Sequence, residues 1–261
     1  MLQTSINNSK LPLTVVILAR NEEDNIRDCI KSASFADEIL VIENNSTDRT
    51  VEYALKSNAK VLKRDLNNDY SAQRNYAIKN SSHDWIFMLD ADERITEDLQ
   101  KEIISAVNSN EDFCYQVSRE NHFVSGVVLH GDLRPDHVER LFLKNKSYYE
   151  GNVHERLHST SPIKRLKGRL IHFPYKSWEI HMNKLNLYST LVAEKYHSKG
   201  KKCNFLIDIV IKPIWAFIKV YFIHLGFLDG KLGLIFSTLH YLYTMEKYLK
   251  LDSLNRNGGK I

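Results

Sequence analysis

Trp85-Ile-Phe-Met-Leu-Asp90-Ala-Asp92-Glu93 is the stretch that decides the fold expected for this chain. Its apolar start predicts a buried strand, so the acids that follow lie at the carboxyl end of that strand, where open α/β sheets bind ligands. Asp90 and Asp92 are separated by one residue, and both carboxylates can point the same way once the strand bends into a turn. With the oxygens of a diphosphate they could share one hard divalent cation. A solvated acidic turn is the alternative.

Strands and helices alternate on both sides of this stretch. β-branched apolar runs predict further strands at residues 13–19, 38–43 and 60–63. Four helices are expected between and after these strands. The first ends at about residue 32, the second begins after a cap at Ser46 or Thr47, and the third covers residues 70–78. The fourth runs from a cap at Thr96 to about residue 107. This alternation is typical of βαβ units, and it predicts an α/β fold with a mostly parallel sheet flanked by helices.

Polar side chains follow the strands of this predicted sheet. Because the carboxyl ends of parallel strands meet at one edge, residues far apart in the sequence should converge there. They are Glu22, Glu43, Asn45, Arg74, Asp90 and Asp92. No G-x-G-x-x-G or Walker A pattern occurs, which disfavours a dinucleotide-dependent redox enzyme and a P-loop NTPase.

The pattern changes after residue 110. Short strands of a small, mixed second sheet are expected at residues 114–118, 124–129 and 140–143, and residues 153–155 and 170–172 close this region. A helix is expected from Ser177 to about Lys199.

The C-terminal region is apolar and basic. Asp208, Lys212 and Lys219 interrupt the apolar run at 205–224 with the spacing of one helical stripe, so a kinked helix lying in a membrane interface is favoured over a spanning helix. Phe205, Ile209, Trp215 and Phe222 are its expected lipid contacts. A tail packed on the protein's own core is the alternative. A glycine-rich turn at 226–233 and a second amphipathic helix at 234–251 follow.

Composition and charge limit the remaining choices. The 261 residues are 43% hydrophobic and 26% charged, which is typical of one large folded domain or a domain with an appendage. Three distant cysteines predict a reducing compartment without disulfides or zinc, and the polar first ten residues predict no signal peptide. Residues 151–261 hold 18 Lys and Arg against 7 Asp and Glu, a net charge of +11. Nucleic acid, anionic lipid or a phosphorylated substrate could meet this basic half, as could solvent alone.

The motifs in their order resemble those of the family-2 glycosyltransferases with the GT-A fold. The matching segments are Ala19-Arg-Asn-Glu22, Glu43-Asn-Asn-Ser-Thr-Asp48, Ala72-Gln-Arg-Asn75 and Asp90-Ala-Asp92-Glu93. The later half resembles a narrower branch, the lipopolysaccharide core β-1,4-glucosyltransferases. The segments that carry this second likeness are Arg140-Leu-Phe, Val153-His-Glu155, Gly168-Arg-Leu-Ile-His172 and Gly226-Phe-Leu-Asp-Gly230.

The resemblance implies an inverting, metal-dependent transfer of a hexose, with glucose from UDP-glucose the best candidate, onto a heptose of a lipopolysaccharide core. Such an enzyme works on the cytoplasmic face of the inner membrane as a peripheral protein, and nucleic acid is then not a partner. A polyprenyl-phosphate sugar transferase of the same fold is the alternative, and a non-catalytic scaffold that binds nucleotide-sugar or lipid is a further one. The domain division expected on this basis is a catalytic domain at 1–200, with a donor half at 11–110 and an acceptor half at 111–200, followed by a membrane-associating region at 201–261.

The resemblance also implies roles for individual residues. Asp90 and Asp92, with His172, would hold Mn²⁺ or Mg²⁺, and Glu155 would be the catalytic base. The residues expected at the nucleotide-sugar are Ala19, Asn21, Glu22, Glu43, Asn45, Arg74, Asp90 and Ala91. His154 is a further candidate for a metal or phosphate contact, although a lone histidine is more often a packing residue. Glu43-Asn-Asn45 departs from the family's usual Asp followed by small residues and Gly, which leaves the base preference open.

Overall fold

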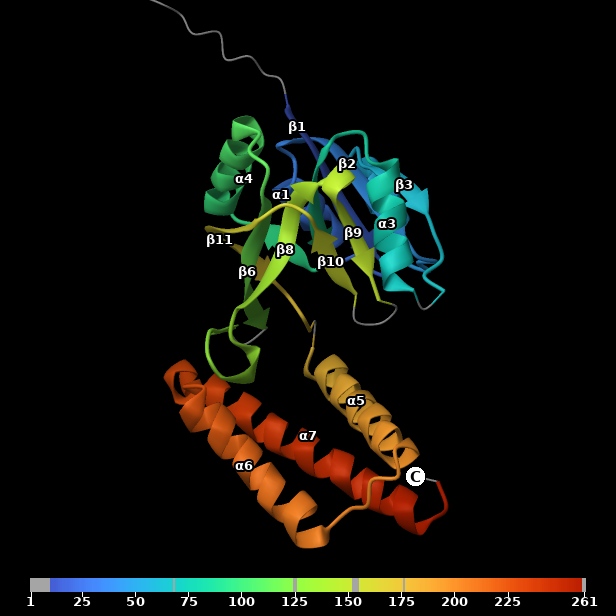
Figure 1. Cartoon of the computed structure of the whole chain (residues 1–261), viewed down its shortest axis with the longest axis vertical. Helices are drawn as coiled ribbons and strands as arrows, with labels where there is room; N and C mark the ends of the chain where they lie inside the picture. Colours follow the sequence, from blue (N-terminus) through green and yellow to red (C-terminus); the bar gives the residue numbers. More distant parts are fainter. Residues whose placement is uncertain (1–9, 68, 124–125, 152–154, 176, 260–261) are drawn as a thin grey trace, which may run out of the picture. The chain divides into compact units, whose positions relative to one another are not determined.

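The computed structural model describes residues 10–67, 69–123, 126–151, 155–175 and 177–259, and these form two compact units (Figure 1). The first, which we call the sheet unit, comprises Met1–Arg119 and Asp136–His172. The second, the helical unit, comprises Glu120–Pro135 and Phe173–Ile261. The predicted division at residue 200 lies inside the helical unit, and as a boundary between independently folding domains it stays a prediction.

Four parallel strands carry the centre of the sheet unit, in the order β3-β2-β1-β4. They are β1 (Leu11–Ala19), β2 (Ala36–Glu43), β3 (Lys60–Lys63) and β4 (Trp85–Asp90). The helices between them are α1 (Ile26–Ser32), α2 (Thr50–Lys56) and α3 (Tyr70–Asn80), and α4 (Glu97–Ser109) comes after β4. The α/β fold predicted from the alternating pattern is confirmed.

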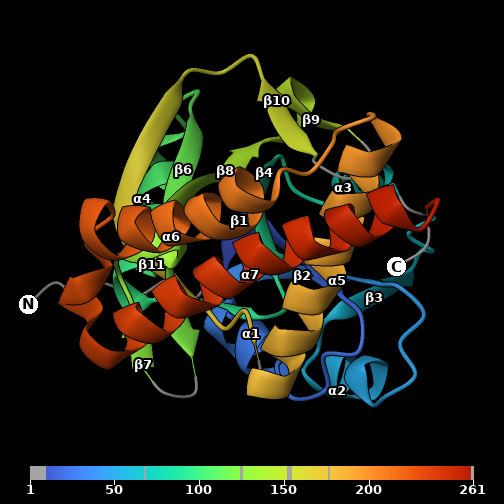
Figure 2. The same ribbon diagram turned by 90° about the horizontal axis from the view of Figure 1, so that it is seen from below.

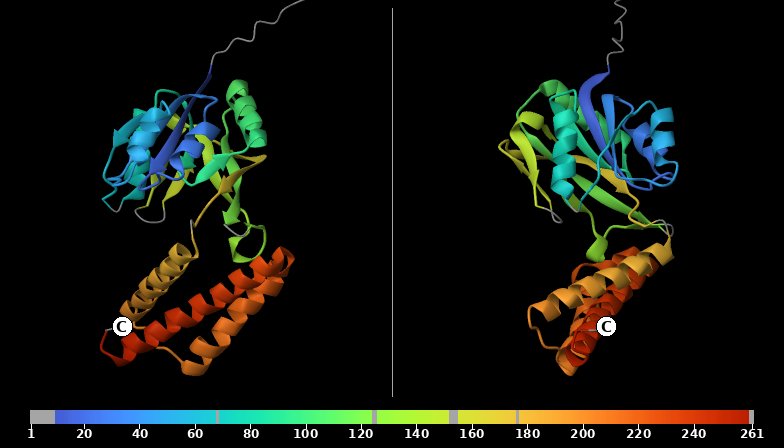
Figure 3. Two further views of the ribbon diagram at one scale, coloured as in Figure 1. Left: turned by 180° about the vertical axis from the view of Figure 1, so that it is seen from behind. Right: turned by 90° about the vertical axis from the view of Figure 1, so that its right-hand side faces the viewer.

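Both faces of this sheet are covered, which explains the continuous apolar runs of β1 and β4. Val15 and Phe87 pack on one face with residues of α1, α2 and α4. Val16 and Met88 point to the other face and pack with residues of α3. Figure 3 shows α3 on the opposite side of the sheet from α1 and α2.

The prediction that 114–118 and 140–143 belong to a second sheet is wrong. They lie in β6 (Cys114–Phe123) and β8 (Asp136–Leu143), and β8 pairs antiparallel with β4 while β6 pairs with β8. β11 (Ile163–His172) and β5 (Glu93–Ile95) extend the same sheet, and β7 (Gly126–Val128) pairs with β6. The physical reason is that β4 would otherwise be an edge strand with unpaired backbone groups.

A small second sheet does exist, as predicted, but other residues form it. It consists of β9 (Ser147–Glu150) and β10 (Arg156–Ser159), which pair antiparallel. Asn75 of α3 holds it in place, because its side-chain amide donates to the carbonyl oxygen of Tyr149 and accepts from the Tyr149 backbone N–H, both at 2.8 Å.

The cap predicted for α2 at Ser46 or Thr47 is also wrong. The N-cap residue is Arg49, whose side chain makes no capping hydrogen bond, while Asp48 Oδ1 accepts from the Thr50 backbone N–H at 2.9 Å. Ser46 and Thr47 instead join two loops: the Ser46 hydroxyl accepts from the Asn21 N–H, and the Thr47 N–H donates to Asn21 Oδ1. The cap at Thr96 for α4 is confirmed. The helix expected from Ser177 is also confirmed as α5 (Trp178–Ser198), and Ser177 caps it.

In the helical unit, α7 (Gly230–Arg256) lies between α5 and α6 (Lys212–Ile218), as Figure 2 shows. π-helical segments at Phe205–Ile211 and Lys219–Ile223 flank α6. Wider turns change which residues share a face, so the predicted single stripe of charge is wrong: Asp208 is buried whereas Lys219 is exposed. Within the described part of the chain, no helix is both long and apolar enough to pass through a bilayer.

Candidate active site

A pocket of about 400 Å³ opens at the carboxyl ends of β1, β2 and β4 in the sheet unit. Its lining residues are Leu18, Ala19, Arg20, Glu22, Asn44, Leu66, Tyr70, Gln73, Asp90, Ala91, Asp92 and His172. Ala19, Glu22, Asp90, Ala91, Asp92 and His172 were predicted as site residues, and the structure brings these six together.

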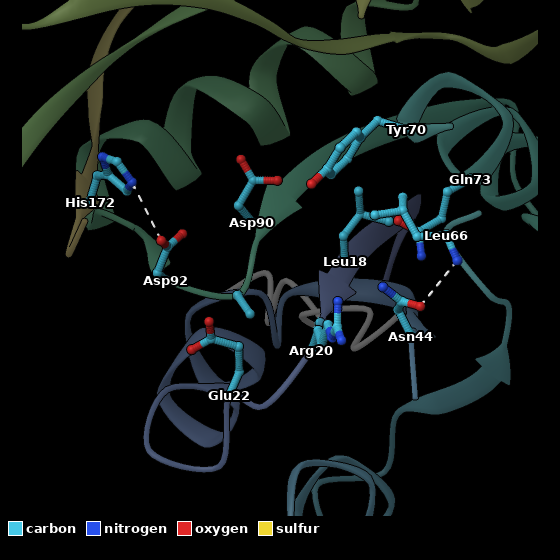
Figure 4. Close-up of a pocket in the computed structure, with 12 residues that line it drawn as sticks. Leu18, Arg20, Glu22, Asn44, Leu66, Tyr70, Gln73, Asp90, Asp92 and His172 are labelled. Atoms are coloured by element: carbon cyan, nitrogen blue, oxygen red, sulfur yellow. Dashed lines mark hydrogen bonds and ion pairs between the residues drawn. The ribbon is translucent and has the colours of Figure 1, made fainter. Parts of the chain in front are cut away.

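The two ends of the pocket differ in chemistry (Figure 4). Carboxylates and the His172 ring gather at one end, which we call the acidic end. At the other end, apolar and amide side chains from Leu18, Leu66 and Asn44 lie with Tyr70. A flat, uncharged group with hydrogen-bonding edges fits the second end, and a cation or a group bound through a cation fits the first.

Backbone pairing at the acidic end explains why His172 reaches Asp92. β11 pairs antiparallel with β5, and its last residue, His172, is opposite Glu93. The ring Nε2 of His172 lies 3.5 Å from Asp92 Oδ2. An imidazole and a carboxylate at this separation can both turn toward one cation.

Asp90 is held by two arginines. Arg140 of β8 donates to its Oδ2 at 2.7 Å, and Arg74 of α3 approaches its Oδ1 at 3.3 Å. Burial alone would raise the pKa of Asp90, but the two guanidinium groups outweigh it and hold the pKa well below the usual range. Asp90 is therefore ionised at neutral pH.

Arg140 also neutralises a second buried acid. Its Nη2 lies 2.6 Å from Glu93 Oε1, and the other Glu93 oxygen accepts from the Asp90 backbone N–H at 3.0 Å. Glu93 is fully buried, and burial raises its pKa although Arg140 opposes this. Glu93 thus fixes the turn after β4 and orients Arg140 rather than facing the pocket.

Glu155, the predicted base, is connected to this cluster by Arg74. The Arg74 Nε donates to Glu155 Oε1 at 3.1 Å, while its Nη2 approaches Asp90. Arg74 is 9% exposed, and its Nη1 has no hydrogen-bond partner among the described residues. Glu155 does not line the pocket, but one guanidinium separates it from the acidic end.

Four other predicted contacts lie outside the pocket lining. Arg74 contacts Asp90 but does not line the pocket. Glu43 is buried, and its carboxylate accepts from the Ser46 backbone N–H. Asn45 donates to Asp65 at 2.8 Å, and Asn21 joins two loops through Thr47. Asn21 and Asn45 both have positive φ, so they shape the loops around the pocket. His154 lies outside the described residues.

The acids at the acidic end do not form a complete metal cage. Within the described ranges, no three His, Cys, Asp or Glu side chains are grouped as metal ligands. This fits a cation that a protein holds with one or two side chains while phosphate oxygens of the substrate supply further ligands. Asp92 and His172 are the side chains available for it, with Asp90 close by.

Sequence reasoning missed several residues of this site. Leu66 comes from the segment between β3 and α3 and Tyr70 is the first residue of α3, where no strand-end rule applies. Leu18 is the penultimate residue of a buried strand. Arg140 lies 50 positions from the acid that it neutralises. Its apolar neighbours Leu141 and Phe142 were the available signal, because an arginine beside them in a buried strand needs an acidic partner.

Comparison with known proteins identifies the family of the chain. The profile described as Glycosyl transferase family 2 matches residues 14–169. An uncharacterized glycosyltransferase of Rickettsia prowazekii, RP128, is 27% identical over 93% of this chain and 86% of its own length. The lipopolysaccharide core biosynthesis glycosyltransferase LpsC of Rhizobium meliloti is 28% identical over 88% of this chain and 90% of its own. The crystal structure of S. aureus TarS 1–349 aligns with a TM-score of 0.46 and 15% identity, covering 96% of this chain and 92% of that one.

We expect Arg140→Leu to lower the free energy of unfolding by about 3–5 kcal/mol, because it leaves the fully buried Glu93, and the partly buried Asp90, without their shared cation. Adding Glu93→Gln should recover part of this loss, since the amide oxygen can still accept from the Asp90 N–H. Urea denaturation measures the free energy of unfolding of the single and the double variant. Arg165→Leu, an exposed arginine of β11, is the control and should change stability by less than about 0.5 kcal/mol. Equal stability of Arg140→Leu and the wild type would contradict the role of Arg140.

Proposed function

The chain belongs to glycosyl transferase family 2, and we propose that this transferase moves a hexose with inversion from a UDP-sugar to a lipid-linked core saccharide of lipopolysaccharide. The observation that carries the proposal is the two-ended pocket, with an ion-binding end beside Asp92 and an apolar, amide-lined end beside Tyr70. A nucleotide diphosphate has the same division into a flat base and an anionic tail.

The acidic end suits a diphosphate only when a cation is bound. Asp92 and His172 would hold Mn²⁺ or Mg²⁺, with Asp90 adding negative charge nearby. When bound, the cation offsets the charge that builds on the leaving diphosphate. Arg74 and Arg140 keep Asp90 ionised and fixed, so the end of the pocket is ordered before the donor arrives.

Glu155 is proposed as the base that takes the proton from the acceptor hydroxyl. Arg74 fixes one oxygen of its carboxylate, which leaves the second oxygen for the acceptor. Because Arg74 contacts both Glu155 and Asp90, it holds the proposed base at a set position relative to the acidic end of the pocket. Ordering the base in this way lowers the entropic cost of reaching an in-line arrangement.

The acceptor is the least constrained part of the proposal. The match to LpsC over most of both chains supports a saccharide of the lipopolysaccharide core, and a core heptose with UDP-glucose as donor is the pairing we propose. The enzyme would then work as a peripheral protein on the cytoplasmic face of the inner membrane. A polyprenyl phosphate is the second candidate acceptor, because the basic C-terminal region suits a phosphorylated lipid equally well.

Measuring UDP release with each acceptor separates these alternatives. We expect UDP-glucose turnover to rise on addition of a lipid A–core acceptor that ends in heptose and to stay at its basal rate with polyprenyl phosphate. Stimulation by polyprenyl phosphate alone would favour the second candidate. UDP binding without release under any condition would indicate a non-catalytic scaffold.

We expect Asp92→Asn to remove most of the activity, because the amide keeps the shape of the side chain but loses the charge that attracts a hard cation. Wild-type activity should also disappear in EDTA and return with Mn²⁺ or Mg²⁺. Asp98→Asn, on the exposed side of α4, is the control and should behave as wild type. Full turnover of Asp92→Asn in EDTA would refute the metal assignment.

Glu155→Gln should lower the turnover rate by about 10²–10⁴-fold, the usual cost of losing a general base. The glutamine oxygen can still accept from Arg74, so calorimetry should find UDP affinity unchanged. Glu150→Gln, an exposed acid of the β9–β10 sheet, is the matched control. Loss of UDP binding with an unchanged rate per bound donor would make Glu155 a binding residue.

A further inference from the structure

The outer side of residues 205–228 in the helical unit is apolar, and we call it the apolar face. Its members are between 37% and 65% exposed. They are Phe205, Leu206, Ile207, Ile211, Ile214, Trp215, Ile218, Phe222, Ile223, Leu225, Phe227 and Leu228. Twelve exposed large apolar residues within one short segment are more than isolated surface apolar residues, and they indicate an interaction surface.

The inner side of the same segment carries one buried acid among apolar residues such as Ala216 and Val220. Asp208 is 5% exposed, and it accepts from Lys212 Nζ at 2.5 Å and from the Asn204 backbone N–H at 2.8 Å. The Tyr248 hydroxyl of α7 lies 3.4 Å from Lys212 and 3.3 Å from Lys201. Exposing twelve large apolar side chains on one short segment is unfavourable in water, so the apolar face is suited to a different medium.

Ile209 belongs to the inner side as well. It is 7% exposed and packs with Ala193, Tyr248, Leu251 and Leu254, so the prediction that it contacts lipid is wrong. Phe205, Trp215 and Phe222, the other three predicted lipid contacts, are on the apolar face.

Charge decides which partner fits this face. Between residues 201 and 235 the only acids are Asp208 and Asp229, and both are engaged inside the unit. Asp208 pairs with Lys212, and Asp229 accepts from the backbone of His130 and lies 2.8 Å from its ring Nδ1. The exposed ionic groups of this segment are Lys202, Lys219 and Lys231, all of them positive.

This pattern favours an anionic lipid surface over a second copy of the chain. In a symmetric pair each apolar face would bring its own lysines against those of the partner, and like charges in an interface are repulsive. The three charges of 205–223 also make the segment unsuitable for crossing a bilayer, so it would lie in the interface plane.

We propose that the apolar face inserts into the headgroup region of an anionic phospholipid bilayer, with Lys202, Lys219 and Lys231 contacting lipid phosphates. This membrane contact deepens the proposed function. It rests on that function in one respect, the lipid-linked acceptor. Trp215 then lies at the boundary between headgroups and acyl chains, where tryptophan is favoured.

Flotation of the full chain with vesicles tests the proposal. We expect binding to phosphatidylglycerol-rich vesicles, weaker binding to phosphatidylcholine vesicles, and a partial loss of binding in high salt. Lys219→Gln should weaken binding to anionic vesicles about fivefold, the effect of one lysine near such a surface. Trp215→Glu should weaken it about tenfold or more.

The control is Ile163→Glu, an equally exposed apolar residue of the sheet unit, which should bind as wild type. Tryptophan fluorescence gives a second readout in a Trp178→Phe background, because Trp85 is buried. Brominated lipids should then quench Trp215, and circular dichroism verifies that each variant is folded.

Three outcomes would overturn the proposal: no flotation under any condition, binding that Trp215→Glu leaves unchanged, or a dimer in solution that Trp215→Glu dissociates while vesicles do not bind. The dimer would identify the face as an interface between copies. Because flotation needs neither donor nor acceptor, its failure is distinct from failure of the proposed transferase activity.

Discussion

The carboxylate of Asp90 between two arginines is the interaction on which the candidate site depends. Arg74 comes from α3 and Arg140 from β8, so this contact joins the parallel part of the sheet, a helix on its face and the antiparallel extension. Arg74 also reaches Glu155 beside the second sheet. A single, partly buried carboxylate is thus connected through Arg74 to the proposed base, Glu155.

Such a cluster costs free energy, because arginines and acids lose their hydration when they are buried. Part of that cost is recovered through geometry: Arg140 bridges Asp90 and Glu93, and Glu93 also accepts from the backbone of Asp90. A well-packed apolar cluster could stabilise the fold at least as well. What the charges add is a rigid, ionised carboxylate beside Asp92, which a site for a cation and a diphosphate requires.

The sequence predicted those features that depend on local pattern. The apolar run of β4 and the acids at its end were identified because both lie within nine consecutive residues, 85–93. The partners of Asp90 were not, because Arg140 reaches it through the pairing of β8 with β4, and no local period encodes that pairing. Long-range pairing also explains the error about the second sheet. β8 pairs with the open edge of β4 and β6 pairs with β8, so these two strands join the main sheet instead.

The helical unit shows a different limit. A helical stripe drawn through Asp208, Lys212 and Lys219 assumes a constant 3.6-residue period, and the π-helical segments on both sides of α6 break that period. The apolar pattern correctly placed Phe205, Trp215 and Phe222 on the exposed side but failed for Ile209, which is buried. The neighbouring helix also contributes: α7 presents the Tyr248 hydroxyl 3.4 Å from Lys212 Nζ, and Asp208, the partner of Lys212, is buried. Apolar residues of the segment lie on both sides: Ile209 and Val220 pack inside the unit, whereas Trp215 and Phe222 are exposed. The exposed ones are those that the fold of this unit leaves uncovered, and an exposed apolar surface of this size indicates an interaction surface.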